Sequence, residues 1–124
     1  MVEPDELIVA MLNKTTEILV SSVKEIYSEC RMFVVGGKVV TGSMYKIGTT
    51  VRHNKDVDQR FYDFAQQMID KYCPEDGIVI DIADTPCGLK IIELNDFNCS
   101  GFYACDVQKI IEAVINLLDG ENNV

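Results

Sequence analysis

Two apolar runs separated by four turn-forming residues constrain the fold of this chain more than any other feature. Residues 78–84 and 89–95 are rich in β-branched and aliphatic side chains, which is typical of strands. The four residues between them are Thr-Pro-Cys-Gly, in which proline fixes φ and glycine adopts a positive φ readily. The pattern therefore predicts a β-hairpin over residues 78–95.

The length of the turn decides which side chains meet across this hairpin. A three-residue loop over residues 86–88 places Asp81 opposite Glu93. Because side chains alternate along a strand, Asn95 then lies on the same face as these two acids. A two-residue loop would instead shift the register by one residue and place Asp81 opposite Ile92.

The three polar residues Asp81, Glu93 and Asn95 are candidate metal ligands. Facing carboxylates have Cβ atoms about 5 Å apart and repel each other unless a cation lies between them. Mg²⁺ prefers oxygen ligands and needs only one or two protein carboxylates. A solvated sheet face is the alternative interpretation, because the chain has 20 acidic residues.

This hairpin resembles the end of an ATP-grasp domain. Its second strand continues as Glu-Leu-Asn-Asp-Phe-Asn-Cys-Ser-Gly, which is similar to the E-x-N-x-F-N-x-S-G of bacterial and phage members. The resemblance implies that Asp81, Glu93 and Asn95 hold the Mg²⁺ ions that bridge nucleotide phosphates. It also implies that Asn98 and Ser100 are binding residues on the acceptor side.

A second block, residues 29–45, resembles the E-x-R-x-F-V-x-x-G-x-V hairpin of the same family. The turn Gly36-Gly37 is a strong signal for a two-residue hairpin loop, and it places Lys38 on the same face as Arg31. The resemblance implies that Arg31 contacts the phosphates and is catalytic, with Lys38 as a further binding residue. The residues alone favour Arg31 as a rim residue that covers apolar surface with its stem. The resemblance covers about residues 18–118.

ATP-grasp enzymes hold nucleotide between two lobes, and only 17 residues precede the matching region here. We therefore expect one lobe of a two-lobe enzyme, completed by a second chain or by a homodimer. The implied activity is that of a Mg²⁺-dependent carboxylate-amine ligase, with ATP and a small carboxylate as substrates and an acyl phosphate as intermediate. The alternative is a non-catalytic binding or interaction protein built on a degenerate lobe.

Charge and composition restrict the class of protein further. A net charge of −9 disfavours binding to nucleic acid. The acidic N-terminus and the absence of a run of about 20 apolar residues exclude a signal peptide and a membrane span, so we expect a cytoplasmic protein. The five cysteines form no C-x-x-C pair, which favours reduced thiols. Cys99 with His53 as a catalytic pair is a third, weaker hypothesis.

The remaining patterns predict an α+β domain over residues 1–124, with a mostly antiparallel sheet and helices on one face, like the C-terminal lobe of an ATP-grasp domain. Apolar residues at helical spacing predict helices, and β-branched residues predict further strands. The expected helices are 3–14 within an N-terminal segment 1–15, 56–72 and 106–119, the last ended by Gly120. The expected strands outside the 78–95 hairpin are 18–21, or 18–26 in a longer form, then 31–35 and 38–43. Residues 45–54 are expected to form a basic loop, residues 17–119 the lobe and residues 120–124 a tail.

Overall fold

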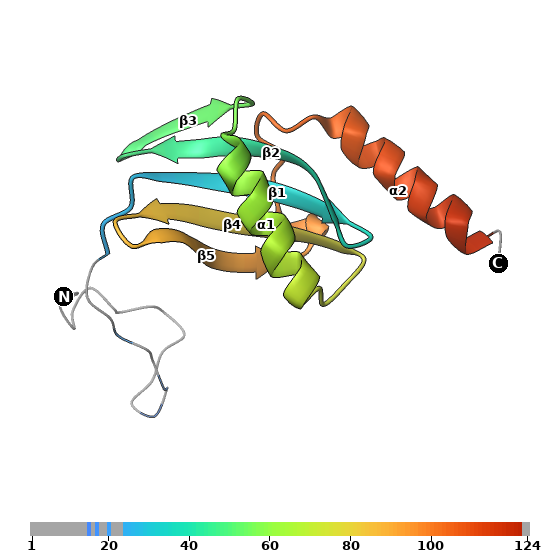
Figure 1. The fold of residues 1–124 in the computed structure, drawn as a ribbon, viewed down its shortest axis with the longest axis horizontal. Coiled ribbons are helices and arrows are strands. Elements are labelled where there is room, and N and C mark those ends of the chain that lie inside the picture. The colour runs from blue at the N-terminus through green and yellow to red at the C-terminus, as the bar shows by residue number, and fades with distance from the viewer. Residues whose placement is uncertain (1–14, 16, 18–19, 21–23, 123–124) are drawn as a thin grey trace.

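The computed structural model describes residues 15, 17, 20 and 24–122. It contains a five-stranded antiparallel sheet of order β3-β2-β1-β4-β5 with a helix on each face (Figure 1). The strands are β1 (Ser28–Val35), β2 (Lys38–Ile47), β3 (Thr50–Asn54), β4 (Gly77–Thr85) and β5 (Gly88–Asn95). The helices are α1 (Gln59–Lys71), α2 (Val107–Asn122) and the short 3-10 helix η2 (Phe97–Cys99). The expected α+β class and antiparallel sheet are confirmed.

The turn between β1 and β2 forms as the sequence predicts. Val35 pairs with Lys38, and both glycines of the turn have positive φ, 59° at Gly36 and 77° at Gly37. This backbone matches the twist of the two strands and excludes most other residues. A Cβ atom at Gly36 would lie 3.2 Å from the Leu117 side chain, so α2 passes directly over the turn.

The turn between β4 and β5 differs from the expected one. Thr85 pairs with Gly88, so the loop has two residues, and the Thr85 hydroxyl accepts a hydrogen bond from Cys87 N at 3.1 Å. The prediction of a three-residue loop is therefore wrong. Asp81 nevertheless pairs with Glu93, because a register shift between Asp81 and Ile82 leaves Ile92 as the extra residue of a β-bulge.

Residues 45–54 do not form the expected loop. β2 continues to Ile47, and β3 pairs with it through a turn that contains Gly48 at φ 61°. The alternation of apolar and polar residues is too weak in this stretch to reveal a strand, because β3 is exposed along most of its length. The hairpin extends the sheet on its β2 side.

One sheet face is covered by α1, and we call it the α1 face. The helix is capped by Asp58, whose carboxylate accepts a hydrogen bond from Arg60 N at 3.1 Å. Its buried residues, Phe61, Ala65 and Ile69, recur every fourth position and so form one stripe. They pack on a layer of strand residues, namely Cys30, Met32, Val34, Met44, Ile78, Ile80 and Ile82.

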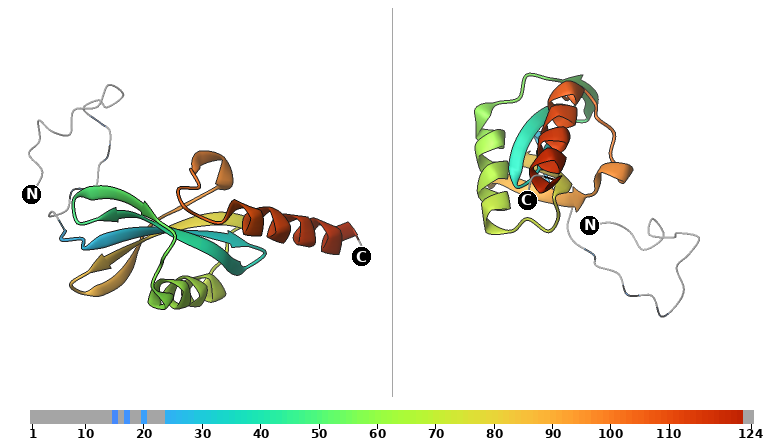
Figure 2. Two further views of the ribbon diagram at one scale, coloured as in Figure 1. Left: turned by 90° about the horizontal axis from the view of Figure 1, so that it is seen from above. Right: turned by 90° about the vertical axis from the view of Figure 1, so that its right-hand side faces the viewer.

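The opposite face carries Arg31, Phe33, Val79 and Asp81, and we call it the Arg31 face. Figure 2 shows α1 on one side of the sheet and the chain that follows β5 on the other. Ile110 of α2 is buried against Phe33 and Val79 in a second apolar cluster. This arrangement corrects the expectation that the helices share one face: α2 covers part of the Arg31 face because its buried stripe fits these two strand residues.

Two expected boundaries also change, and one expected region is not described. α2 continues through Gly120 to Asn122, so the expected tail is helical in its first part. The predicted helix over 3–14 and most of the strand over 18–21 lie outside the described residues. Residues 24–26 are described and are not part of a strand. Within the part of the chain that the structure describes, no helix is both long and apolar enough to cross a membrane.

Candidate functional site

A buried ion pair between Arg31 and Asp81 lies at the centre of the Arg31 face. The two residues are direct partners on β1 and β4. Arg31 Nε donates to Asp81 Oδ1 and Nη2 donates to Oδ2, each at 2.9 Å, which is the bidentate geometry favoured by a guanidinium and a carboxylate. Arg31 is 8% exposed and Asp81 3%, so Arg31 is not the rim residue that the residues alone favoured.

The remaining guanidinium nitrogen of Arg31 joins the pair to the chain that follows β5. Arg31 Nη1 donates a hydrogen bond to Gly101 O at 3.1 Å. The hydrogen bonds from Arg31 to Asp81 raise the pKa of the guanidinium above its usual value. Arg31 therefore carries a permanent positive charge that two acceptors hold in one position.

Aromatic rings surround the Arg31 guanidinium. Its Cζ lies 4.6 Å from the ring centroid of Tyr103 and 5.7 Å from that of Tyr45, within the range of a cation–π interaction. The two tyrosine rings stack at 5.3 Å, and His53 lies 4.5 Å from Tyr103. Burial, and then the negative charge of Asp81, raise the pKa of Tyr45, so its phenol is neutral at physiological pH.

Residues 96–106 form the connection between β5 and α2, and we call them the 96–106 connection. It crosses the Arg31 face from β5, at one edge of the sheet, to β2 (Figure 2). Ala104 N donates to the buried Ser43 hydroxyl at 3.1 Å, and Asp106 N donates to the Thr41 hydroxyl at 3.1 Å. These side-chain acceptors on β2 fix the connection over Arg31.

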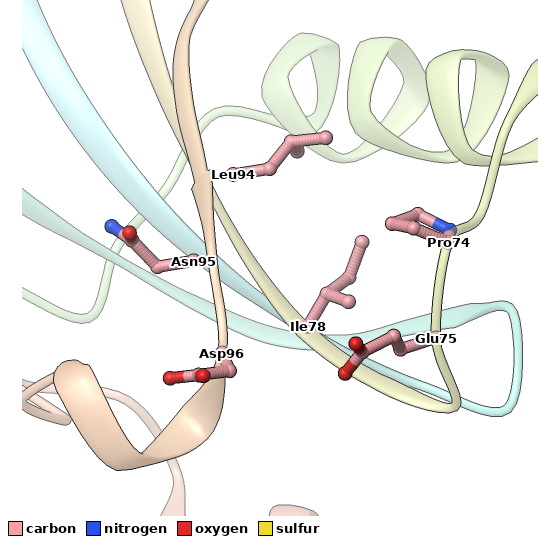
Figure 3. Close-up of a pocket in the computed structure, with 6 residues that line it drawn as sticks. All are labelled: Pro74, Glu75, Ile78, Leu94, Asn95 and Asp96. Atoms are coloured by element: carbon pink, nitrogen blue, oxygen red, sulfur yellow. The ribbon is translucent and has the colours of Figure 1, made fainter.

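Glu93 and Asn95 lie beside the ion pair on the same face. Glu93 pairs with Asp81 and Asn95 pairs with Val79. Figure 3 shows the Asn95 side chain extending from the opposite side of β5 to Leu94, as alternation requires. The three predicted metal ligands thus share one face, and two carboxylates with one amide oxygen suit a hard cation in chemical type. Both oxygens of Asp81 already accept hydrogen bonds from Arg31.

The other predicted binding residues are placed differently. Lys38 is exposed in the β1–β2 turn and pairs with Val35, four residues along β1 from Arg31, so the structure does not bring these two cations together. Asn98 is exposed in η2, and the Ser100 hydroxyl donates to Asp96 O at 3.0 Å. Asn98 and Ser100 therefore belong to the 96–106 connection.

Two cavities border β5. One, of about 300 Å³, lies at the end of the strand between Asn95 and residues 74–78 (Figure 3). The other, of about 650 Å³, is lined by Ala83, Lys90 and Ile92 together with residues 24–26 and 85–87. Ala83 is two residues from Asp81 on β4, so the larger cavity borders the same face as the ion pair.

Sequence reasoning gave no role to Tyr45, His53 or Tyr103. Tyr103 comes from the 96–106 connection, whose path over the sheet no local pattern predicts. For the third hypothesis, a Cys-His pair, His53 stacks on Tyr103, while the side chain of Cys99 lies outside the described part of the structure. Burial raises the pKa of both Cys30 and Cys105 to about 12, so these thiols are neutral and poorly nucleophilic.

The antiparallel sheet with oxygen donors and a fixed arginine on one face defines an ATP-grasp lobe, and a comparison with known families agrees. A family model described as an ATP-grasp domain, the third family of its clade, matches residues 1–114. The chain belongs to this family. A search of curated proteins finds no match.

Proposed function

We propose that the chain is the metal-binding and phosphate-binding lobe of a Mg²⁺-dependent, ATP-using carboxylate-amine ligase. One observation carries the proposal: Asp81 and Glu93 face each other across β4 and β5, next to a buried and permanently charged arginine. Family membership supports nucleotide binding. The facing carboxylates support a cation, because without one they repel each other.

Each side chain has a distinct task in this proposal. Asp81, Glu93 and Asn95 would hold Mg²⁺, which when bound neutralises negative charge on the nucleotide phosphates. Arg31 stabilises the charge that develops on the transferred phosphoryl group. The carboxylate substrate attacks the γ-phosphate of ATP and releases ADP, and an amine then displaces phosphate from the acyl phosphate. Asn98 and Ser100 line the acceptor side.

The larger cavity supports a location for the rest of the nucleotide. It has a volume of about 650 Å³, within the usual range for small-molecule sites. Ala83, in its wall, is two residues from Asp81 on the same face. A nucleotide with its base in this cavity would direct its phosphates toward Asp81 and Glu93. Lys90, also in the wall, adds positive charge on this path.

Catalysis requires a second lobe to cover this face, because phosphoryl transfer depends on positioning and on the exclusion of water. We propose that another chain or a second copy of this one supplies it. A non-catalytic binding protein is the competing function. It is favoured by the commitment of both Asp81 oxygens to Arg31, since a pair that never opened would serve only as scaffold.

Calorimetric titration of Mg²⁺·ATP tests the proposal. The wild type and Glu112→Ala, which alters an exposed acid on α2, should bind, whereas Glu93→Ala should lose metal-dependent binding. Light scattering in the same buffer gives the oligomeric state. A folded wild type that binds no nucleotide, and a dimer that persists in EDTA, would instead identify an interaction protein.

A further inference from the structure

Tyr103 has an unusual backbone conformation directly above the buried ion pair. Among the described residues it is the one non-glycine with positive φ, at 50°, a conformation that bulky side chains rarely adopt. Its ring remains 40% exposed, so burial of the ring does not explain why the conformation is kept. Residues in such conformations persist where their surroundings hold them, and they concentrate at functional sites.

The contacts of Tyr103 show what holds it. Its ring covers the Arg31 guanidinium at 4.6 Å and stacks between Tyr45 and His53. On either side of it, Gly101 accepts a hydrogen bond from Arg31 and Ala104 donates one to Ser43. The backbone around Tyr103 is thus fixed at both ends, and the ring closes over Arg31.

The closed pair is incompatible with a metal ion on Asp81. Both carboxylate oxygens accept hydrogen bonds from Arg31 at 2.9 Å. Mg²⁺ requires near-octahedral geometry at about 2.0–2.1 Å, and a guanidinium so close to the same oxygens repels a divalent cation. Metal binding to Asp81 and pairing of Arg31 with Asp81 therefore compete. By linkage, whatever stabilises the pair weakens the metal site.

We propose that Tyr103 is a positioning residue that holds Arg31 on Asp81, so that this closed pair must open before Asp81 binds a divalent cation. The opening frees the Arg31 guanidinium for an anionic ligand at the moment when the metal arrives. The metal half of this inference rests on the proposed function. The positioning half, the hold of Tyr103 on Arg31, does not.

Titration with Mn²⁺ alone, followed by electron paramagnetic resonance, tests the metal half. Tyr103→Ala removes the ring and should tighten Mn²⁺ binding several-fold, whereas Tyr103→Phe keeps the ring and should bind as the wild type does. Tyr72→Ala, an exposed tyrosine at the end of α1, is the matched control and should change nothing. Unchanged or weaker binding by Tyr103→Ala, with binding lost in Glu93→Ala, overturns this inference and leaves the proposed metal site standing.

The nitrogen-15 resonance of Arg31 Nε–H in metal-free protein tests the positioning half. Its proton should exchange slowly with water in the wild type and in Tyr103→Phe, and at least ten-fold faster in Tyr103→Ala. Equal exchange in all three overturns the role of Tyr103. Absence of Mn²⁺ binding in every variant, with the exchange difference present, overturns the metal half together with the proposed function.

Discussion

Asp81 and Glu93 face each other across β4 and β5 because Ile92 is accommodated in a β-bulge. Without this extra residue, the two-residue turn would place Ile92 opposite Asp81 and direct Glu93 toward the α1 face. Bulges commonly redirect side chains beside functional sites. Here the bulge creates the carboxylate pair, so the geometry of the candidate metal site does not depend on the turn alone.

Loss of the Asp81 carboxylate should destabilise the protein far more than loss of a neighbouring ion pair. Asp81→Ala leaves the buried Arg31 charge unpaired, which costs about 3–5 kcal/mol in comparable buried pairs. Asp84→Ala is the matched control on the same strand, because its partner Arg60 is half exposed and such pairs contribute about 0–1 kcal/mol. Urea unfolding measures both values. Equal losses would contradict a central role for the Arg31–Asp81 pair.

Neighbouring residues on α2 should show which side of the helix packs on the sheet. Ile110 is 4% exposed and Ile111 is 52% exposed. Ile110→Ala should lower the free energy of unfolding by about 2–5 kcal/mol, as for other buried isoleucines, while Ile111→Ala should cost less than about 1 kcal/mol. Thermal unfolding by circular dichroism suffices. A larger effect at Ile111 would mean that α2 presents its other side to the sheet.

Gly42 should not tolerate even an alanine. A Cβ atom there would overlap the sulfur of Met32 and lie 3.3 Å from Arg31 O. Overpacking of this kind costs about 1–3 kcal/mol, so Gly42→Ala should lower the urea midpoint. Gly101→Ala serves as the control, since a Cβ atom at Gly101 meets nothing within 4 Å. If both variants unfold at the wild-type midpoint, the close approach of β1 and β2 is not as tight as described.

Stability should fall as the pH rises through the alkaline range. Burial raises the pKa of Cys30 and Cys105 from 9.0 to about 12, so between these values the unfolded chain loses thiol protons that the folded protein retains. The free energy of unfolding therefore decreases with rising pH in this window and is unaffected by these groups below it.

Comparison of variants isolates the thiol contribution from that of other alkaline groups. Cys105→Ala should show a shallower decline in the free energy of unfolding than the wild type as the pH rises above about 9, the ordinary pKa of a thiol, measured by urea titration. Cys87 is exposed in the β4–β5 turn, and Cys87→Ala should keep the wild-type slope. A wild-type slope in Cys105→Ala would show that this thiol ionises as easily in the folded protein as in the unfolded chain.

Local patterns in the sequence were sufficient for the elements and for one face of the site. The glycine pair at residues 36–37 specifies its turn through backbone conformation alone. The spacing of apolar residues specifies α1 and α2. The common face of Glu93 and Asn95 follows from alternation within a single strand, so this part of the candidate site needs no tertiary information.

The rest of the site depends on relationships between distant segments. Arg31 meets Asp81 because β1 and β4 are neighbours, a pairing between residues 50 positions apart that no turn signal specifies. The bulge at Ile92 and the position of Tyr103 depend on packing against other elements. The helix α2 lies on the Arg31 face because its buried stripe meets Phe33 and Val79, whereas the stripe alone does not indicate which face it covers.

The path of the 96–106 connection has a consequence for the order of events in folding. Its hydrogen bonds join Ala104 to Ser43, 61 residues away, and Gly101 to Arg31, 70 residues away. Contacts over such separations form slowly, because a long loop must close first. On the ribosome, β1 and β2 emerge well before the connection that covers them. The charged centre of the sheet therefore stays open to solvent until the chain beyond residue 100 has been made and has crossed back over it.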